Sequence, residues 1–322
     1  MLFGRPSTHL ITEFAMSLSE QFSRLTYHSL GDAIRSVFRF GVRALSSTGS
    51  ALGSYAVLPL DHRAVVSPTS GEFVYGQVRR RIAEQDAVYD TLLRAMSPHT
   101  SLAKTIIQQE AQNETTPFWD NAYFHGNDAS AAWALTALMR PRLIVEIGSG
   151  NSTKFFRHAI EYHGLSTRLA CVDPAPRAEI DAIADEIHYE TVQRTSTNVF
   201  TSLEPGDILF FDGSHLVVQG CDTQYVFLEI LPLLPKGVLV HVHDVNLPYE
   251  YRSFYNSRLY GEQYLLAALL LFSPDWKPVL PVYWLEKTGR LTATEQPAAS
   301  FWITNDLDFL IDRITTATAA TH

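Results

Sequence analysis

The chain has 322 residues, of which 46% are hydrophobic and 18% charged, so it can bury a sizeable core as one large or two modest domains. Its 16 Pro, 17 Gly and two Cys exclude collagen-like, low-complexity and disulfide-framework proteins. The formal net charge of -9 argues against a nucleic-acid binder, because neutralising phosphates needs a basic face. The longest apolar run covers nine residues, 264–272, too few to cross a membrane, and no secretory signal pattern opens the chain. We therefore expect a cytoplasmic protein without a membrane span.

The first part of the chain is predicted to be helical. Residues 1–58 are rich in Ser and poor in acids, and residues 59–71 have the Pro and Gly content of a linker. The predicted helices are residues 32–45, 72–96 and 102–112. The first is amphipathic, which favours packing on the main domain or on a second subunit over lying on a membrane. We expect residues 1–120 to form a helical extension that serves as a lid or an oligomerisation region, with a homodimer as the expected assembly.

From Arg142 onward, short β-rich apolar runs alternate with helical stretches, a pattern typical of a parallel sheet covered on both faces. The predicted strands are residues 143–147, 169–173, 188–192, 208–211 and 238–243, followed by β-like segments at 277–285 and 300–304. The predicted helices between them are residues 153–163, 178–185, 197–203, 219–234 and 262–272. Residues 121–322 are therefore expected to form one α/β catalytic domain.

The turn after the first of these strands is the most informative segment. Glu146 ends the strand, and Gly148 and Gly150 open the next helix, which lets a ligand approach the backbone closely. A dinucleotide site would have a third glycine where Thr153 stands, and Glu146 would repel a diphosphate. A ligand that carries an ammonium group fits better, which leaves a nicotinamide-dependent oxidoreductase as a remote alternative.

Three later segments agree with this turn in order and spacing. The second strand ends in Asp173, whose carboxylate can accept hydrogen bonds from ribose hydroxyls. The fourth strand leaves through Asp212-Gly-Ser-His215, and the fifth through His241-Val-His243-Asp244. Together these segments resemble the class I S-adenosylmethionine-dependent methyltransferases, in particular their bacterial small-molecule branch, over residues 124–304.

The resemblance implies a Rossmann-like, mostly parallel sheet of seven strands with helices on both faces, an antiparallel last strand, and S-adenosylmethionine at the carboxyl ends of the first strands. It assigns Glu146, Gly148 and Gly150 to the methionine part of the cofactor, with Ser152 and Thr153 in the helix cap nearby. It assigns Asp173 to the ribose and Gln193 to the adenine. Asp212 is a further expected cofactor contact.

The acids and histidines that follow the fourth and fifth strands should meet at one edge of the sheet. One hypothesis makes His215 or His243 the general base for an incoming nucleophile. A second makes Asp212, His215, His243 and Asp244 a divalent metal site, although the metal-dependent relatives have an acidic or amide pair where His243 and Asp244 stand. In a third, His241 is a hydrogen-bonded core residue and Asp244 caps a turn.

Two aromatic and polar segments are candidates for substrate contacts. Tyr123 and Phe124 precede the first strand, and Tyr251 and Arg252 follow Asp244. Arg252 could pair with a substrate carboxylate. Core packing explains each segment equally well.

The sequence thus predicts an S-adenosylmethionine-dependent methyltransferase that acts on oxygen or nitrogen of a small polar molecule. One alternative is an enzyme of the same fold that moves or cyclises the aminocarboxypropyl arm and releases methylthioadenosine. Another is a cofactor-binding or assembly subunit without catalytic activity.

Overall fold

The structure of the chain, a computed structural model, describes residues 74–255 and 258–319. The predicted helix at residues 32–45 and the linker at 59–71 lie outside these residues, as does the start of the helix predicted at residues 72–96. Among the residues that the structure describes, no helix has both the length and the apolar character that a membrane crossing requires.

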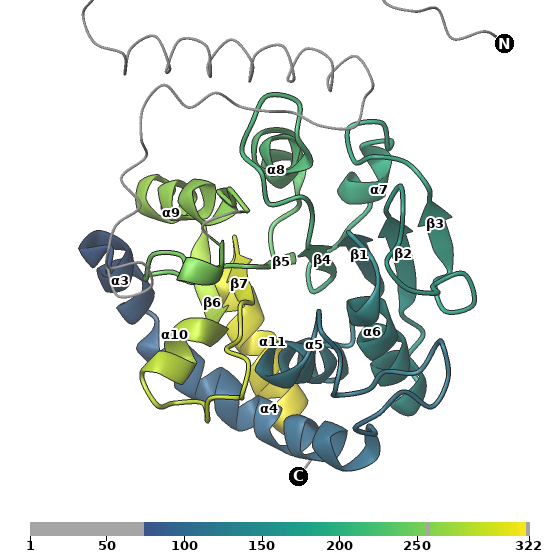
Figure 1. Cartoon of the computed structure of the whole chain (residues 1–322). Coiled ribbons are helices and arrows are strands. Elements are labelled where there is room, and N and C mark those ends of the chain that lie inside the picture. Colours follow the sequence, from purple (N-terminus) through teal and green to yellow (C-terminus); the bar gives the residue numbers. More distant parts are fainter. Residues whose placement is uncertain (1–73, 256–257, 320–322) are drawn as a thin grey trace, which may run out of the picture. The chain divides into compact units, whose positions relative to one another are not determined.

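A seven-stranded sheet forms the centre of the described chain, in the order β3-β2-β1-β4-β5-β7-β6 (Figure 1). The strands are β1 (Leu143–Ile147), β2 (Arg168–Val172), β3 (Glu186–His188), β4 (Ile208–Phe211), β5 (Leu239–Val242), β6 (Lys277–Pro281) and β7 (Phe301–Thr304). The first five strands run parallel, and β7 is antiparallel to both β5 and β6. Every residue of β1, β4, β5 and β7 is buried, so both faces of the sheet are covered. The predicted fold is confirmed.

The longer helices gather around this sheet (Figure 1). The α-helices are α3 (Gly76–Ala83), α4 (Asp86–Ile106), α5 (Gly126–Met139), α6 (Asn151–Tyr162), α7 (Asn198–Thr201), α8 (Asp222–Tyr225), α9 (Glu262–Phe272), α10 (Val282–Lys287) and α11 (Leu307–Ala319). Shorter helical turns are η1 (Val226–Ile230), η2 (Leu231–Leu233) and η3 (Ser253–Tyr255). Helix α5 contacts α4, α6 and α11, and all its residues after Gly126 are buried. Its many alanines allow these close contacts.

Several predicted boundaries were wrong. Residues 178–185 form turns instead of a helix, because Asp185 binds the β2 backbone through its own N–H and its carboxylate, which draws this segment toward β3. Strand β3 ends at His188, and residues 189–192 turn toward the carboxyl end of the sheet. The apolar run at 282–285 belongs to α10, since a short apolar run fits helix and strand alike.

The helical predictions also needed adjustment. A break at Glu84 and Gln85 separates α3 from α4, and α4 continues through Pro98 into the second predicted stretch. The helix predicted at 219–234 is divided into α8, η1 and η2, and the helix predicted at 197–203 is reduced to α7.

Asp207 joins the entrances of β1 and β4. Its buried carboxylate accepts hydrogen bonds from the backbone N–H groups of Arg142 (2.8 Å), Leu143 (2.9 Å) and Glu204 (2.9 Å). It also lies 3.0 Å from the guanidinium of Arg142. One side chain therefore fixes the start of the two strands whose far ends carry Glu146 and Asp212.

We expect Asp207→Ala to lower the free energy of unfolding by about 3 kcal/mol, because three backbone donors lose a charged acceptor. Urea denaturation measures the change, and Asp275→Ala, at an exposed turn, is the matched control. Equal stability of the two variants would contradict the anchoring role of Asp207.

Candidate active site

A buried hydrogen-bond network shapes the loop after β1. The carboxylate of Glu146, which has no exposed surface, accepts hydrogen bonds from the hydroxyls of Ser152 and Thr153, the latter at 2.6 Å. Thr153 Oγ1 in turn accepts the N–H of Gly150 at 2.9 Å. Burial raises the pKa of Glu146 to about 8 in spite of these hydrogen bonds. The acid that ends β1 thus holds the glycine turn and the first turn of α6 together.

Gly148 brings this loop against the end of β4. Its φ is +81°, and a Cβ built on it would lie 1.8 Å from the carbonyl oxygen of Asp212. No side chain fits there, and an L-residue would also be strained at this φ. The glycine is therefore required for packing the two loops, independently of any ligand.

A cavity of about 520 Å³ opens over these loops at the carboxyl ends of β1, β2 and β4. Six of the predicted cofactor residues line it: Gly148, Gly150, Ser152, Asp173, Gln193 and Asp212. Glu146 and Thr153 are buried behind the loop and do not line the cavity. Their hydrogen bonds position the loop, so the predicted direct contact with the methionine part does not follow from this geometry.

Asp173 occupies the position expected of a ribose-binding acid. One of its oxygens accepts the N–H of Ser149 at 2.7 Å, and the other accepts the N–H of Ala175 at 2.8 Å. The first of these oxygens also accepts the hydroxyl of Ser149 at 3.3 Å, so the second is the one that keeps a lone pair for a ligand hydroxyl. The carboxylate is thus fixed by the loop yet available at the cavity.

A second cavity, of about 320 Å³, lies at the ends of β4 and β5. It shares Tyr123, Arg177 and Asp212 with the first cavity. Other predicted site residues that line it are His215, His243, Asp244 and Arg252. Asp212 therefore stands where the two cavities meet.

Two of the predicted substrate residues lie elsewhere. Phe124 is buried and borders the first cavity, and its ring packs on Phe210 and His243. Tyr251 lines neither cavity. Its ring packs in an aromatic cluster with Tyr255 and Tyr264, as the core-packing alternative expected.

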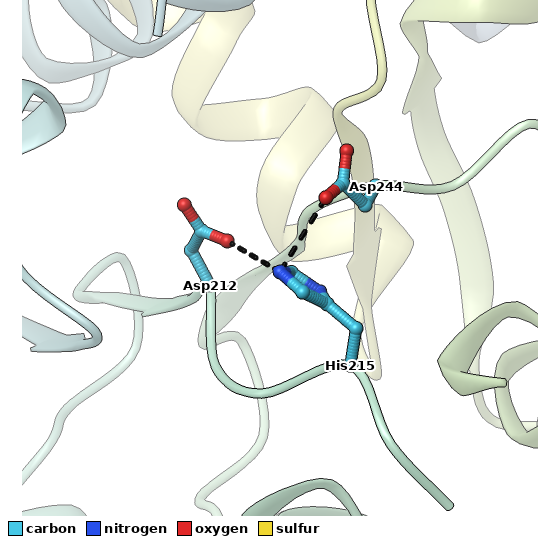
Figure 2. Close-up of side chains that lie close together, drawn as sticks. All are labelled: Asp212, His215 and Asp244. Carbon is cyan, nitrogen blue, oxygen red and sulfur yellow. Dashed lines mark ion pairs between the residues drawn. The ribbon is translucent and has the colours of Figure 1, made fainter. Parts of the chain in front are cut away.

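His215 is enclosed by three carboxylates. Figure 2 shows two of them, Asp212 and Asp244, on either side of its ring nitrogen. Its Nε2 lies 3.3 Å from Asp212 Oδ1 and 3.4 Å from Asp244 Oδ2, and its Nδ1 lies 3.2 Å from Glu262 Oε1. Burial lowers the pKa of His215, but Asp212 and Glu262 outweigh it and raise the pKa well above its usual value. Conversely, although burial raises the pKa of Asp212, the neighbouring His243 and His215 hold it well below its usual range.

His215 and two of its neighbours, Asp212 and Asp244, fit a metal ion. One ligand atom each from Asp212, His215 and Asp244 lies within 4.8 Å of the other two. Separations of 3.3 and 3.4 Å from Nε2 are long for a charge-assisted hydrogen bond, which is about 2.7 to 2.9 Å. They suit neighbouring ligands around an ion with bonds of about 2.1 Å. Glu262 at Nδ1 matches the carboxylates that orient metal-bound histidines.

His241 lies within β5 and His243 directly follows this strand. Their side chains occupy different environments, although residues two apart on a strand share a face. His241 is a core residue, with its Nε2 at 2.9 Å from Ser300 Oγ and its ring stacked on Phe210. His243 lines the second cavity, and its buried Nδ1 has no hydrogen-bond partner among the described residues. Burial lowers the pKa of His243, but Asp212 and Asp244 raise it more.

Sequence reasoning assigned no role to Asp222 and Tyr255, which hold the loops of His215 and Asp244 in place. His215 and Asp244 have φ angles of +65° and +54°, which residues other than glycine rarely adopt. Asp222 stabilises the loop of His215 by accepting both the N–H and the hydroxyl of Ser214. Tyr255 anchors Asp244, because its hydroxyl donates to Asp244 Oδ1 at 2.8 Å. No local pattern marks Tyr255, whereas Asp222 stands at a position that the family resemblance includes, although no role was predicted for it.

Comparison with known proteins agrees with this geometry. Residues 145–245, from β1 to the residue after Asp244, match a family model described as a methyltransferase domain. No curated protein matches the chain.

Solved structures with similarity to the chain include three methyltransferases. An O-methyltransferase from Bacillus cereus in complex with S-adenosylhomocysteine is 15% identical, with a TM-score of 0.35, over 70% of this chain and 98% of that one. The S-adenosylhomocysteine-bound PaMTH1 from Podospora anserina is 14% identical, with a TM-score of 0.35, over 78% and 98%. The O-methyltransferase TomG from Streptomyces achromogenes, in complex with S-adenosylmethionine, is 15% identical, with a TM-score of 0.34, over 70% and 96%.

The family match covers nearly all of the residues that line the first cavity, and it reaches the second through Arg177, Asp212, His215, His243 and Asp244. The sheet has the predicted strand arrangement. Residues 145–245 therefore match a methyltransferase domain, on a sheet arranged as the resemblance to the class I S-adenosylmethionine-dependent methyltransferases implies.

Proposed function

We propose that the chain transfers the methyl group of S-adenosylmethionine to a hydroxyl oxygen of a small polar molecule. The observation that carries this proposal is the meeting of two cavities at Asp212, one of about 520 Å³ and one of about 320 Å³. The first has the size of a cofactor site, and the second the size of a small acceptor site. Methyl transfer needs this arrangement, because its main requirement is an in-line approach of the nucleophile.

The residues of the first cavity fit the cofactor. Asp173 keeps a lone pair on Oδ1 for the ribose, and the glycine turn of Gly148 and Gly150 lines the cavity beside it. Gln193 lines the same cavity at the loop after β3, where the adenine is expected. When bound, S-adenosylmethionine supplies an electrophilic methyl group on its sulfonium.

The second cavity favours a hydroxyl acceptor, because a hydroxyl must lose a proton as it attacks and basic groups surround the junction. His243 is the better base candidate, since its Nδ1 has no hydrogen-bond partner among the described residues. His215 is engaged at both ring nitrogens and is less suited to accept a proton. A nitrogen acceptor remains an alternative, as a lone-pair nucleophile would use the same positioning.

Asp212, His215 and Asp244 would hold a divalent metal, with Glu262 orienting the histidine. The mixed nitrogen and oxygen donors favour Mn²⁺, Zn²⁺ or Fe²⁺ over Mg²⁺ and Ca²⁺, which prefer oxygen donors. Such an ion would supply Lewis acidity toward a substrate hydroxyl.

The two alternative functions give different products with the same cofactor. Methyl transfer leaves S-adenosylhomocysteine, whereas transfer of the aminocarboxypropyl arm leaves methylthioadenosine. A subunit without catalytic activity leaves neither. Chromatography of the nucleoside products therefore separates the three.

We expect calorimetric titration to show micromolar binding of S-adenosylmethionine and S-adenosylhomocysteine, and no binding of NAD. Asp173→Asn should lower the affinity for both adenosyl ligands at least roughly tenfold, because the ribose then lacks its charged acceptor. The control Asp275→Asn, at an exposed turn, should bind as the unmodified protein does. A folded protein that binds neither adenosyl ligand would refute the proposed cofactor.

We also expect the chelator-treated protein to bind one Mn²⁺ ion, measured by calorimetry without any acceptor. Glu262→Gln should weaken this binding by roughly tenfold to a hundredfold, because the amide orients the His215 ring less strongly. Glu229→Gln, an exposed position, is the control. If the unmodified protein binds no Mn²⁺, the metal site is excluded. Equal affinities of the two variants would exclude the orienting role of Glu262.

A further inference from the structure

Three arginines surround the second cavity without a carboxylate partner. Arg177, Arg252 and Arg258 line it, and none of them forms an ion pair within the part of the chain that the structure describes. Arg157 and Arg290, in contrast, pair with aspartates at 2.7 and 2.9 Å elsewhere in the fold. The cavity is also lined by Asp128, Asp212, Asp244 and Glu295, so the three guanidinium groups face an otherwise acidic site without an ion pair to it.

Aromatic rings hold these guanidinium groups. Arg252 lies 5.3 Å from the ring centre of Tyr255 and 5.7 Å from that of Tyr283, and Arg258 lies 4.2 Å from that of Phe254. Stacking on a ring fixes the plane of a guanidinium without using its N–H donors. Apart from Nη2 of Arg252 and Nη1 of Arg258, which donate to the hydroxyls of Tyr255 and Tyr260, the donors stay available for a planar anion.

Arg252 has a donor that lacks a partner. Its Nη2 donates to the hydroxyl of Tyr255 at 3.1 Å, while its buried Nε has no hydrogen-bond partner among the described residues. A buried donor without a partner is costly, so a small shift of the guanidinium that brings this donor to an anion in the cavity is favourable. A carboxylate matches the fork geometry of this group.

Tyr255 connects this arginine to the reactive end of the cavity. Its hydroxyl accepts from Arg252 Nη2 at 3.1 Å and donates to Asp244 Oδ1 at 2.8 Å. The two hydrogen bonds keep the guanidinium within about 6 Å of Asp244. An anion on Arg252 would thus lie a few bonds from a hydroxyl beside Asp244 and Asp212, which is the span of a small hydroxy acid.

We propose that the acceptor is a hydroxycarboxylic acid whose carboxylate is bound by Arg252, with Arg258 adding positive charge at the same cavity. This assignment rests on the proposed function, since it places the hydroxyl at the junction with the cofactor cavity. The carboxylate pairs with the guanidinium of Arg252, and the rings of Phe254 and Tyr255, which line the cavity, provide an apolar wall for the body of the acid.

Paired acids and amides test this assignment by calorimetry in the presence of S-adenosylhomocysteine. The probes are salicylate against salicylamide, gallate against gallamide, and lactate against lactamide. At least one acid should bind roughly tenfold or more tightly than its amide. In Arg252→Met, the ratio of the acid affinity to the amide affinity should fall toward one. In Arg252→Lys, this ratio should lie between those of Arg252→Met and the unmodified protein, because a lysine lacks the planar fork. Arg80→Met removes the same charge at an exposed position of α3 and should keep the full preference.

The affinity for S-adenosylhomocysteine distinguishes failure of the hydroxy acid assignment from failure of the proposed function. Arg252→Met should leave that affinity unchanged, which shows that the first cavity is intact. If S-adenosylhomocysteine binds but no acid is preferred to its amide, or the preference survives in Arg252→Met, the hydroxy acid assignment is overturned alone. If S-adenosylhomocysteine does not bind the unmodified protein, the proposed function fails, and the assignment fails with it.

Discussion

The contact between Gly148 and the main chain of Asp212 is the constraint on which the rest of the site depends. It brings the loop after β1 against the end of β4, with no space for a side chain between them. The first loop forms one wall of the larger cavity, and Asp212 belongs to both cavities. The hydrogen bonds of the buried Glu146 then give the loop its shape. A cofactor and an acceptor can therefore meet at one carboxylate only because of this packing.

Backbone conformation places the second set of groups at the same junction. His215 and Asp244 both adopt positive φ angles, at a cost of about 1 to 3 kcal/mol each. Asp222 and Tyr255 hold their loops by hydrogen bonds. Strain that is maintained in this way at two neighbouring loops is typical of sites where side chains must be aimed at a ligand. The result is a histidine between two aspartates, with Glu262 behind it.

The sequence predicted most of what lies on regular strands. The bounds of β1, β4 and α9 agree with prediction, because an unbroken apolar strand or a helix start is a local signal. Asp173, Asp212 and Asp244 could be placed at one edge of the sheet because parallel strands share their carboxyl ends. The behaviour of Glu146 could not be read in the same way, since whether an acid faces a ligand or the loop behind it depends on the turn.

The residues that sequence reasoning missed act over long distances in the chain. Arg177 and Arg258 reach the second cavity from irregular segments, and periodicity carries no information there. The helix predicted at 178–185 was wrong for a related reason, because the tertiary hydrogen bonds of Asp185 override the helical pattern of this segment. Motifs therefore located the residues at the strand ends, whereas those that reach the cavities from irregular segments were not predicted.

A crystal structure of the protein with S-adenosylhomocysteine and Mn²⁺ tests the central claim most directly. The account predicts that the ligand occupies the larger cavity, with its ribose on Asp173 and its sulfur facing Asp212 toward the second cavity. A ligand bound elsewhere, or one whose sulfur points away from that junction, would contradict the account.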